Sequence, residues 1–460
     1  MRTTAPIALL GTTLAALFAG GLRVAVAEPG ANIALGKPYT FSQPTNYSKC
    51  GGPSDSTDLT DGVYTDGEPG AFWVTPTTAG WGWLHTRHVW IMADLGRVEP
   101  IAGVSFSTAG GWGGVSWPLM IDIQVSDDGE RFRSAGDLVD LTRGDLPDPA
   151  ARWTVRRFRY ETAALQTRGR FVRLVVVPSS SFVFCDEIEI TRGPDAFLAL
   201  SPGVRTEERI KPERMIRLGC AHRLRLDLQR VRAELEGSQL ATSAKRDALR
   251  SADRLAGRIT ERDFPLDTRT FRAVVPFNAL HREVFALHAR VLAADGGSDL
   301  RLWQNEMHAP LTPFDKPTGE GAELHVRMMR NEFRSAAFNL TNASPDARRL
   351  KLRITGLPGG TSPSHVVPHA VEFVDTRDGV VVASALVPLP REGRAYSIDV
   401  PAGMPRQVWL LFRPGDLDAG DYRGEVVLTG GGVTERVPLT ISIADVRFPD
   451  DTDLFFSMWD

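Results

Sequence analysis

The chain has 460 residues, of which 42% are hydrophobic and 24% charged, a composition that excludes a disordered or fibrous protein. Its formal net charge of -3 supplies no strong field that would favour nucleic acid or an anionic membrane. Three cysteines exclude a small disulfide-stapled scaffold. The length suggests about three domains, and the 43 glycines and 31 prolines indicate many turns and therefore a β-rich architecture.

The N-terminus has the pattern of a secretory signal peptide over residues 1–27. Arg2 precedes an apolar run from 5 to 21, and Ala25-Val26-Ala27 supplies the small residues of a cleavage site. We therefore expect a secreted protein, extracellular or periplasmic, whose mature chain contains no membrane span. An uncleaved membrane anchor is the alternative, although the run is short and rich in Thr and Gly.

Residues 31–195 predict a β-sandwich. Apolar Ile121, Ile123 and Val125 alternate with polar residues, as in a half-buried strand, and Asp128-Gly129 follows as a turn. Short strands separated by turns are typical of an antiparallel sandwich. The strands expected here are 89–94, 101–107, 121–126, 153–160, 171–177 and 187–191.

Residues 198–295 predict helices. Apolar residues recur at helical spacing from Leu224 to Leu235, from Ala241 to Ile259 and from Leu280 to Val291, and Gly237 ends the first stripe. Many arginines accompany these stripes. They form either a surface for an anionic ligand or a solvated helix face with acids interspersed.

Residues 300–448 return to strand patterns and predict a second, Ig-like sandwich. The fold class expected is therefore mainly β and multidomain, with a helical segment between two sandwiches. Residues 449–460 end on the apolar run from Leu454 to Trp459. An unpaired apolar strand is a liability, so we expect this segment to begin a further domain.

Six motifs in the first sandwich carry a family resemblance. They are Leu35-Gly36-Lys37-Pro38, Leu59-Thr60-Asp61-Gly62, Ala93-Asp94-Leu95-Gly96, Ser126-Asp127-Asp128-Gly129, Arg170-Phe171-Val172-Arg173 and Glu187-Ile188-Glu189-Ile190. In this order the set resembles the discoidin family, also called coagulation factor 5/8 type C domains, and its bacterial carbohydrate-binding members above all. The resemblance covers 31–195 and implies a jelly-roll sandwich that often holds a structural calcium ion.

The resemblance implies that calcium lies between the Asp61 loop and the closing strand. Asp61 and Glu187 would supply carboxylates and Thr65 a hydroxyl or carbonyl, which are the hard oxygen ligands that calcium prefers. The loop departs from the family pattern at Val63-Tyr64, where a small polar residue is common. The alternative is a plain turn in which Glu187 makes a hydrogen bond.

The resemblance and the exported location also imply a disulfide between Cys50 and Cys185. These residues lie towards the two ends of the domain, and a bridge would staple them. Two separate thiols are the alternative. Cys220 is left over and is expected to be a small buried hydrophobe.

Aromatic residues beside glycines predict a glycan-binding site. Trp81, Trp83, His85, Trp112 and Trp117 lie in glycine-rich segments, and Phe182 could line the same end of the sandwich. An indole stacks on the C–H face of a sugar, while polar side chains bind its hydroxyls. The alternative is that several of these tryptophans belong to the core.

The second sandwich carries a further resemblance. Asn331-Glu332-Phe333, Gln407-Val408-Trp409-Leu410 and Gly420-Asp421-Tyr422 occur in order, and Tyr422 fits the tyrosine corner of Ig-like domains. The set is similar to the accessory sandwich that precedes the catalytic barrel in uncharacterised bacterial glycoside-hydrolase-like proteins. Phe455 to Asp460 fits the start of such a barrel.

The sequence singles out no catalytic residue. No nucleophile elbow, zinc motif or phosphate-binding loop occurs, and 56 acids select no carboxylate pair. We therefore expect a secreted glycan-binding protein with polysaccharide as its partner, the substrate-targeting part of a glycoside-hydrolase-like polypeptide. Enzymatic activity is expected only if a barrel follows. The alternative is a non-enzymatic adhesion or surface-structural protein that binds a glycan, protein or phospholipid.

Overall fold

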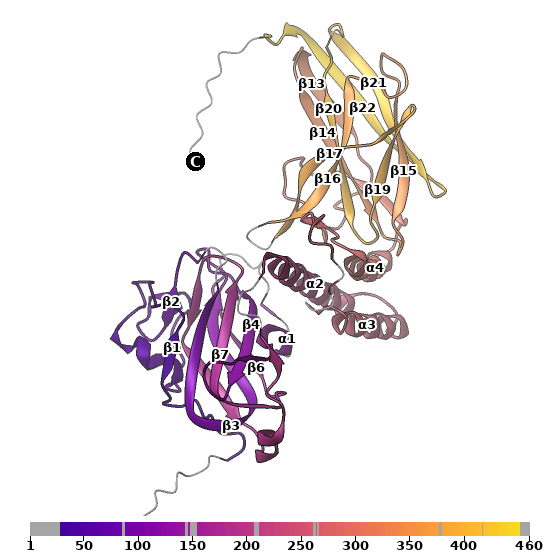
Figure 1. Cartoon of the computed structure of the whole chain (residues 1–460). Helices are drawn as coiled ribbons and strands as arrows, with labels where there is room; N and C mark the ends of the chain where they lie inside the picture. Colours follow the sequence, from indigo (N-terminus) through magenta and orange to yellow (C-terminus); the bar gives the residue numbers. More distant parts are fainter. Residues whose placement is uncertain are drawn as a thin grey trace, which may run out of the picture.

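The computed structural model describes residues 28–450, apart from 85–87, 143–145, 148–153, 207–210, 261–263, 265, 377–379 and 416. The chain is mainly β, and its three long helices lie between two sandwiches (Figure 1). This confirms the fold class expected from the sequence. The predicted signal peptide and residues 451–460 fall outside the described residues. In the described part, no helix is both long and apolar enough to cross a membrane.

The first sandwich is built mostly from one large sheet. Its strands follow the order β1-β3-β7-β4-β5-β10; β6 and β9 pair with β3, and β2 pairs with β8 in a separate small sheet. The elements are β1 (Tyr39–Phe41), β2 (Ala79–Trp81), β3 (Val89–Gly110), β4 (Pro118–Ser126), β5 (Arg133–Asp137), α1 (Leu138–Leu141), β6 (Arg156–Thr162), β7 (Thr167–Pro178), β8 (Val183–Cys185), β9 (Glu187–Arg192) and β10 (Val204–Arg205).

Strand β3 runs through both halves of the first sandwich. The sequence predicts two strands here, at 89–94 and 101–107, but the structure joins them into one. The register shifts between Asp94 and Glu99, where Gly96 adopts a φ of 85°. The first half of β3 pairs with β1 and β7, and the second half pairs with β6 and β9.

Strand β4 is more deeply buried than its alternating pattern predicts. Ile121, Ile123 and Val125 face the core as expected. Asp122 and Gln124, expected at a solvent face, are buried as well. Gln124 Nε2 donates to Asp122 Oδ2 at 2.7 Å, and Arg173 Nε donates to Gln124 Oε1 at 2.8 Å. These hydrogen bonds satisfy the polar face and allow both sides of the strand to be covered.

The helical segment contains α2 (Pro212–Gly237), α3 (Thr242–Ala256) and α4 (Ala279–Ala294). The predicted stripe from Leu224 to Leu235 is buried. It shares one core with Trp303, Phe373 and Met404 of the second sandwich. The apolar faces of the helices are therefore buried against that sandwich as well as against one another.

Helix α2 also contacts the first sandwich. Its Leu226 belongs to the core of that sandwich. Gln229 donates to the carbonyl oxygen of Leu146 at 2.9 Å and accepts from the amide of the same residue at 3.0 Å. Arg225 pairs with Asp140 at 2.5 Å. The two sandwiches thus meet through one helix.

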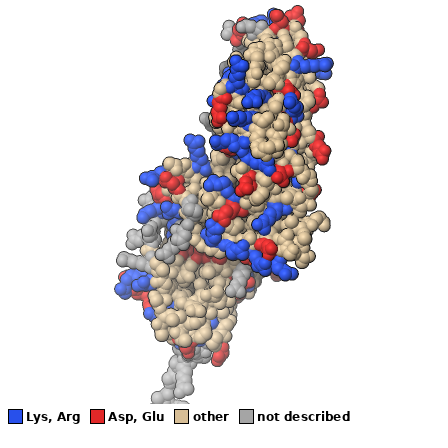
Figure 2. All heavy atoms as spheres, turned by 90° about the vertical axis from the view of Figure 1, so that its right-hand side faces the viewer, with Lys and Arg blue, Asp and Glu red and all other residues tan. Residues whose placement is uncertain are grey.

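The helix arginines largely pair with acids. Arg230 lies 3.3 Å from Glu234, Arg258 lies 2.6 Å from Glu283, and Arg232 pairs with an acid on α3. Figure 2 shows basic and acidic side chains interspersed over the helices and the second sandwich. This arrangement favours the solvated helix face over a surface for an anionic ligand.

The second sandwich packs two sheets face to face, with strand orders β11-β16-β20-β14-β12 and β13-β22-β21-β15-β19-β18; β17 pairs with β16. The Tyr422 hydroxyl donates to the carbonyl oxygen of Asp418 at 2.9 Å, which is the corner predicted from the sequence. The strands are β11 (Val274–Val275), β12 (Leu300–Trp303), β13 (Leu324–Arg330), β14 (Arg334–Asn342), β15 (Arg348–Thr355), β16 (Val366–Asp375), β17 (Val381–Pro388), β18 (Arg391–Glu392), β19 (Ala395–Val400), β20 (Pro405–Phe412), β21 (Gly420–Gly430) and β22 (Val433–Arg447).

Candidate functional site

A group of aromatic rings extends from the core of the first sandwich to its surface. Phe184 is buried, Tyr47 and Phe182 are half-buried, and Trp83 is 58% exposed. The ring of Trp83 lies 5.8 Å from that of Phe182 and 6.3 Å from that of Tyr47. Tyr47 and Phe184 meet edge to face at 5.0 Å. An exposed indole therefore packs on a cluster of tilted and edge-to-face rings.

The backbone at Trp83 is strained. Its φ is 55°, in the left-handed region that bulky residues rarely adopt. The neighbouring residues hold it there: Asn46 Oδ1 accepts from the Gly82 amide at 2.7 Å, and Asn46 Nδ2 donates to the Gly82 carbonyl oxygen at 3.3 Å. The Leu84 amide donates to the carbonyl oxygen of Ser181 at 2.8 Å. Strain that the surroundings maintain in this way is typical of functional sites.

Trp112 presents a second exposed indole, on a turn that packs beside Phe182. It is 46% exposed and starts a tight turn closed by the Val115 amide, which donates to the Trp112 carbonyl oxygen at 3.0 Å. Gly114 adopts a φ of 77°, and a Cβ there would lie 3.8 Å from the Phe182 ring. The turn therefore packs beside Phe182. We call Tyr47, Trp83, Trp112 and Phe182 the aromatic rim.

Two predicted ligand contacts belong instead to the core. Trp81 is 0% exposed, and its Nε1 donates to the carbonyl oxygen of Gln43 at 3.1 Å. Trp117 is 3% exposed and packs so closely on Gly110 that a Cβ there would lie 3.1 Å from the indole. The structure thus corrects the prediction for both side chains, because neither reaches the surface of the rim.

The remaining predicted contacts have mixed outcomes. Trp83 and Trp112 are exposed, and Phe182 packs against the ring of Trp83. His85 lies outside the described residues. The structure adds Asn46 and Tyr47, which the sequence pattern does not single out. They lie in an irregular loop that approaches Gly82 only in the folded chain. The only signal for them in the local sequence is that Asn46 and Ser48, residue types common in turns, flank Tyr47.

The predicted calcium loop contains a buried carboxylate with an unpaired oxygen. Glu187 is fully buried; its Oε2 accepts from the Gly62 amide at 3.2 Å, and its Oε1 has no hydrogen-bond partner. Burial, together with the charges of Asp61, Glu189 and Asp186, raises the pKa of Glu187 to about 8, although the Gly62 hydrogen bond opposes the rise. The hydrogen bond expected for a plain turn is present, but it satisfies only one of the two oxygens.

Other groups around this loop are partly satisfied. The Thr65 amide donates to Asp186 Oδ2 at 2.8 Å, and Asp186 Oδ1 is likewise buried without a partner. The Thr65 hydroxyl lies 3.1 Å and 3.2 Å from those of Thr77 and Thr78. Asp61 is exposed and accepts from the Val63 amide at 2.8 Å. Orphaned carboxylate oxygens fit a hard cation.

Side chains alone do not complete a metal site. Among the described residues, no group of three or more His, Cys, Asp or Glu side chains is arranged to hold a metal ion. An ion near Asp61 and Glu187 therefore needs backbone carbonyl oxygens as further ligands. The Thr65 carbonyl remains a candidate, since the hydroxyl of that residue faces other threonines.

The predicted disulfide is not formed in the structure. Cys50 and Cys185 are separate buried thiols, as is Cys220. Neighbouring residues of a strand point to opposite faces. Phe184 therefore packs with Cys50 in one cluster, while Cys185 faces the main core of the sandwich. This corrects the expected bridge.

A scan against models of protein families finds no match, and a search of curated proteins finds none either. Three solved structures illustrate the partial similarity to known folds, and each has a low TM-score. A family 123 glycoside hydrolase from Clostridium perfringens is 8% identical over 33% of this chain, with a TM-score of 0.25; the match spans 28% of the hydrolase. A fucolectin from striped bass, Morone saxatilis, is 11% identical over 88% of this chain and 99% of its own, with a TM-score of 0.25. The C-terminal domain of a chitobiase from Bacteroides fragilis is 17% identical over 34% of this chain and 96% of its own, with a TM-score of 0.22.

Proposed function

We propose that this chain is a secreted glycan-binding protein that holds a polysaccharide on the aromatic rim. The observation that carries the proposal is Trp83, an exposed indole kept in a strained backbone conformation by Asn46. A large exposed aromatic side chain costs solubility, and strain costs stability, so the two together indicate selection for contact with a ligand.

The geometry of the rim suits a sugar ring. Trp83 and Trp112 offer apolar faces on which the C–H groups of a pyranose pack. The Trp83 ring already packs against Phe182 and Tyr47, so its binding to a sugar immobilises little that is not already held. Asn46 is exposed and retains one amide hydrogen and further lone pairs for sugar hydroxyls.

The proposed role is to bring substrate to a catalytic domain of a glycoside-hydrolase-like polypeptide. Helix α2 contacts both sandwiches and thereby links the rim-bearing sandwich to the second one. A bound polysaccharide would be kept near whatever follows the second sandwich, which raises its local concentration there.

The proposal includes a structural calcium ion near Asp61 and Glu187. The two carboxylates and the Thr65 carbonyl would hold it, with other backbone oxygens. Bound there, the ion would neutralise the buried carboxylate and stiffen the loop after Thr60.

The test is retention of the secreted protein on insoluble polysaccharides and on a glycan array. The double variant Trp83→Ala, Trp112→Ala should weaken retention by about tenfold or more, as expected for central aromatic contacts. Phe333→Ala is the matched control, because Phe333 is 63% exposed but lies on the second sandwich. Unchanged retention by a correctly folded double variant would rule out the rim as the binding site.

A further inference from the structure

The second sandwich exposes apolar side chains on the outer side of one of its sheets. Val408 of β20 faces the core, and neighbouring residues of a strand point to opposite sides. Trp409 and Leu411 therefore point outward, and Val367 of β16, which pairs with Leu411, points the same way. All three are only half-buried, although the ring of His308 lies 5.7 Å from that of Trp409. Strand β20 lies between β14 and β16, so the middle of this sheet presents apolar groups to solvent.

Two further exposed residues extend this surface. Phe333 is 63% exposed, and Cζ of Arg413 lies 5.2 Å from the centroid of its ring, which places Phe333 at the end of β20. Leu386 of β17 is 49% exposed. It lies opposite Val371 of β16, whose side chain points outward like that of Val367. Adjoining exposed apolar residues, unlike scattered ones, indicate a contact surface. We call this surface the outer patch; its members are Phe333, Val367, Leu386, Trp409 and Leu411.

The chain leaves the second sandwich at one end of the outer patch. The Phe448 amide donates to the carbonyl oxygen of Arg330 at 2.8 Å. Asn331 Nδ2 donates to the carbonyl oxygen of Phe448 at 3.1 Å and to Asp450 Oδ1 at 2.9 Å. Asn331 is two residues from Phe333. These hydrogen bonds therefore hold the last described residues against the turn that carries Phe333.

The residues that follow can reach the patch and match its apolar character. Asp451-Thr452-Asp453 leads into the apolar run Leu454-Phe455-Phe456-Ser457-Met458-Trp459. The three linking residues span about 10 Å when extended, and the six of the run about 20 Å more. From Arg413 to the level of Leu386 the sheet extends over about six residues, or about 20 Å. The apolar run is thus long enough to cover the patch from the end at which the chain leaves.

The charges favour the same occupant. Residues 450–460 contain four aspartates and neither lysine nor arginine. The outer patch contains no acid, and the Arg413 guanidinium stands beside Phe333 at its near end. Arg447 Nη2 lies 3.0 Å from Asp450 Oδ1, so the first acid of the segment is already held against the sandwich. A basic end of the patch and an acidic segment that starts beside it are electrostatically complementary.

We infer that residues 454–459 dock on the outer patch of their own chain. The segment buries apolar side chains that the second sandwich otherwise leaves exposed, and Arg413 attracts its aspartates. Docking fixes the direction in which the chain runs past the second sandwich. This contact is independent of the aromatic rim, which lies on the first sandwich.

The test is photocrosslinking of the whole chain with p-benzoylphenylalanine at position 456 in place of phenylalanine. Mass spectrometry should find crosslinks within one chain to peptides of the outer patch. Phe333→Asp and Leu386→Asp should each lower the yield of these crosslinks about fivefold or more, because each replaces an apolar contact by a charge that repels the aspartates of the segment. Both side chains are already largely exposed, so neither change should unfold the sandwich.

A control variant and a second measurement separate docking from general effects. Val204→Asp is the matched control, because Val204 is 68% exposed but lies on the first sandwich. It should leave the yield unchanged. Chymotrypsin should cut slowly after Phe455 and Phe456 in the chain without the photoreactive residue. It should cut about tenfold faster in Phe333→Asp, where the docked segment is released.

Three outcomes overturn the inference. The first is that position 456 forms no crosslink to the outer patch. The second is that the crosslinks to the patch join two chains, which means that a second copy supplies the segment. The third is that Phe333→Asp and Leu386→Asp change neither the crosslink yield nor the rate of cleavage. None of these outcomes affects the glycan-retention test of the aromatic rim, so the two proposals stand or fall separately.

Discussion

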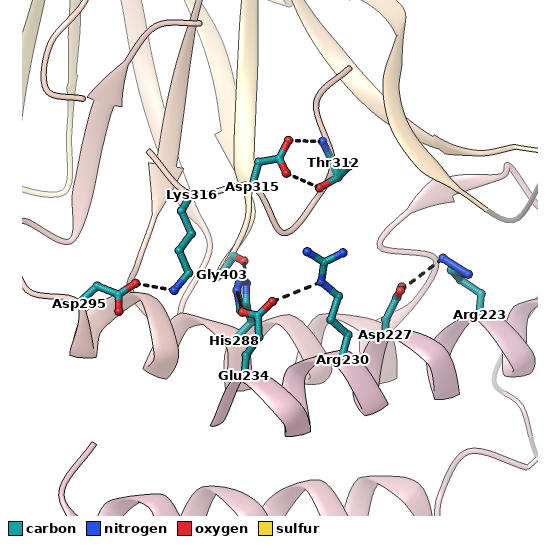
Figure 3. A network of polar contacts seen from close by, with 10 residues as sticks. All are labelled: Arg223, Asp227, Arg230, Glu234, His288, Asp295, Thr312, Asp315, Lys316 and Gly403. Atoms are coloured by element: carbon teal, nitrogen blue, oxygen red, sulfur yellow. Dashed lines mark hydrogen bonds and ion pairs between the residues drawn. The ribbon is translucent and has the colours of Figure 1, made fainter. Parts of the chain in front are cut away.

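The Nδ1 atom of His288 on α4 lies 2.6 Å from the carbonyl oxygen of Gly403, in the loop before β20. Its Nε2 lies 3.0 Å from Oε2 of Glu234 on α2 (Figure 3). The buried ring thus lies between a backbone carbonyl oxygen on one side and a carboxylate on the other. Burial alone would raise the pKa of Glu234, but His288 and Arg230 outweigh it and lower that pKa. The His288 imidazole thus connects α2 and α4 to the second sandwich.

Gly403→Ala should separate α4 from the second sandwich. A Cβ at Gly403 would lie 1.9 Å from the carbonyl oxygen of Phe285, and its φ is +64°. We expect a loss of about 3 kcal/mol or more in the free energy of unfolding, measured by urea denaturation. Gly393→Ala is the control, since Gly393 has a φ of +63° and open space around it. The Gly393→Ala variant should lose only about 1 kcal/mol of unfolding free energy. Equal losses in the two variants would mean that the close approach of Gly403 to Phe285 adds nothing to the cost.

The stability of the first sandwich should depend on both pH and calcium through Glu187. Its pKa rises from 4.5 to about 8 on folding, so its contribution is full below the lower value and is lost as the pH rises through the higher one. In chelator, the melting temperature should therefore fall over this range. Calcium should replace the proton and raise the melting temperature most at the alkaline end.

The size of the calcium effect follows from linkage. Calcium at about 100 times its Kd adds about 2.7 kcal/mol, or about 5–10 °C for a unit of this size. Glu187→Gln should abolish the calcium effect and reduce the pH dependence, of which the buried Asp137 keeps a share because its pKa is also raised to about 8. If calcium changes the melting temperature at no pH, the Asp61 loop is a plain turn with a protonated Glu187.

Asn46→Ala should weaken glycan retention without touching any aromatic ring. The change removes both hydrogen bonds to Gly82 and frees the backbone that presents Trp83. Two hydrogen bonds of this kind are worth about 1–3 kcal/mol, so retention should fall by about tenfold or more. Asn32→Ala is the control, since Asn32 Oδ1 also accepts from two backbone amides in the same sandwich, those of Ala34 and Ile190. It should lower stability and leave retention unchanged, whereas equal effects would exclude a positioning role for Asn46.

Thiol labelling decides the state of the cysteines. Burial raises the pKa of Cys50 and of Cys220 to about 12, and that of Cys185 is raised as well. The native protein should therefore resist iodoacetamide. After unfolding without reductant, mass spectrometry should find an adduct on each of the three cysteines. An adduct on Cys220 alone would show that Cys50 and Cys185 are bridged after all.

Periodicity along the chain was sufficient to predict most of the secondary structure. The apolar stripe from Leu224 to Leu235 lies in α2, and the alternation at Ile121 and Ile123 lies in β4. Tyr422 closes its corner as the local motif predicts. These features depend on neighbours within a few residues, whose geometry each element fixes by itself. For the second sandwich, the strand patterns of residues 300–448 predicted a β-sandwich, and the structure placed its individual strands.

Only the tertiary structure decided which side chains are accessible. Trp81 and Trp83 stand two residues apart beside the same glycine, yet one is 0% exposed and the other 58%. The difference arises because Asn46, far away in the sequence, turns the backbone at Trp83 out of the strand. Trp117, His222 and Asp375 likewise line one cavity although they come from three separate parts of the chain. Burial and long-range pairing depend on how elements pack together, and no local pattern of residues encodes that packing.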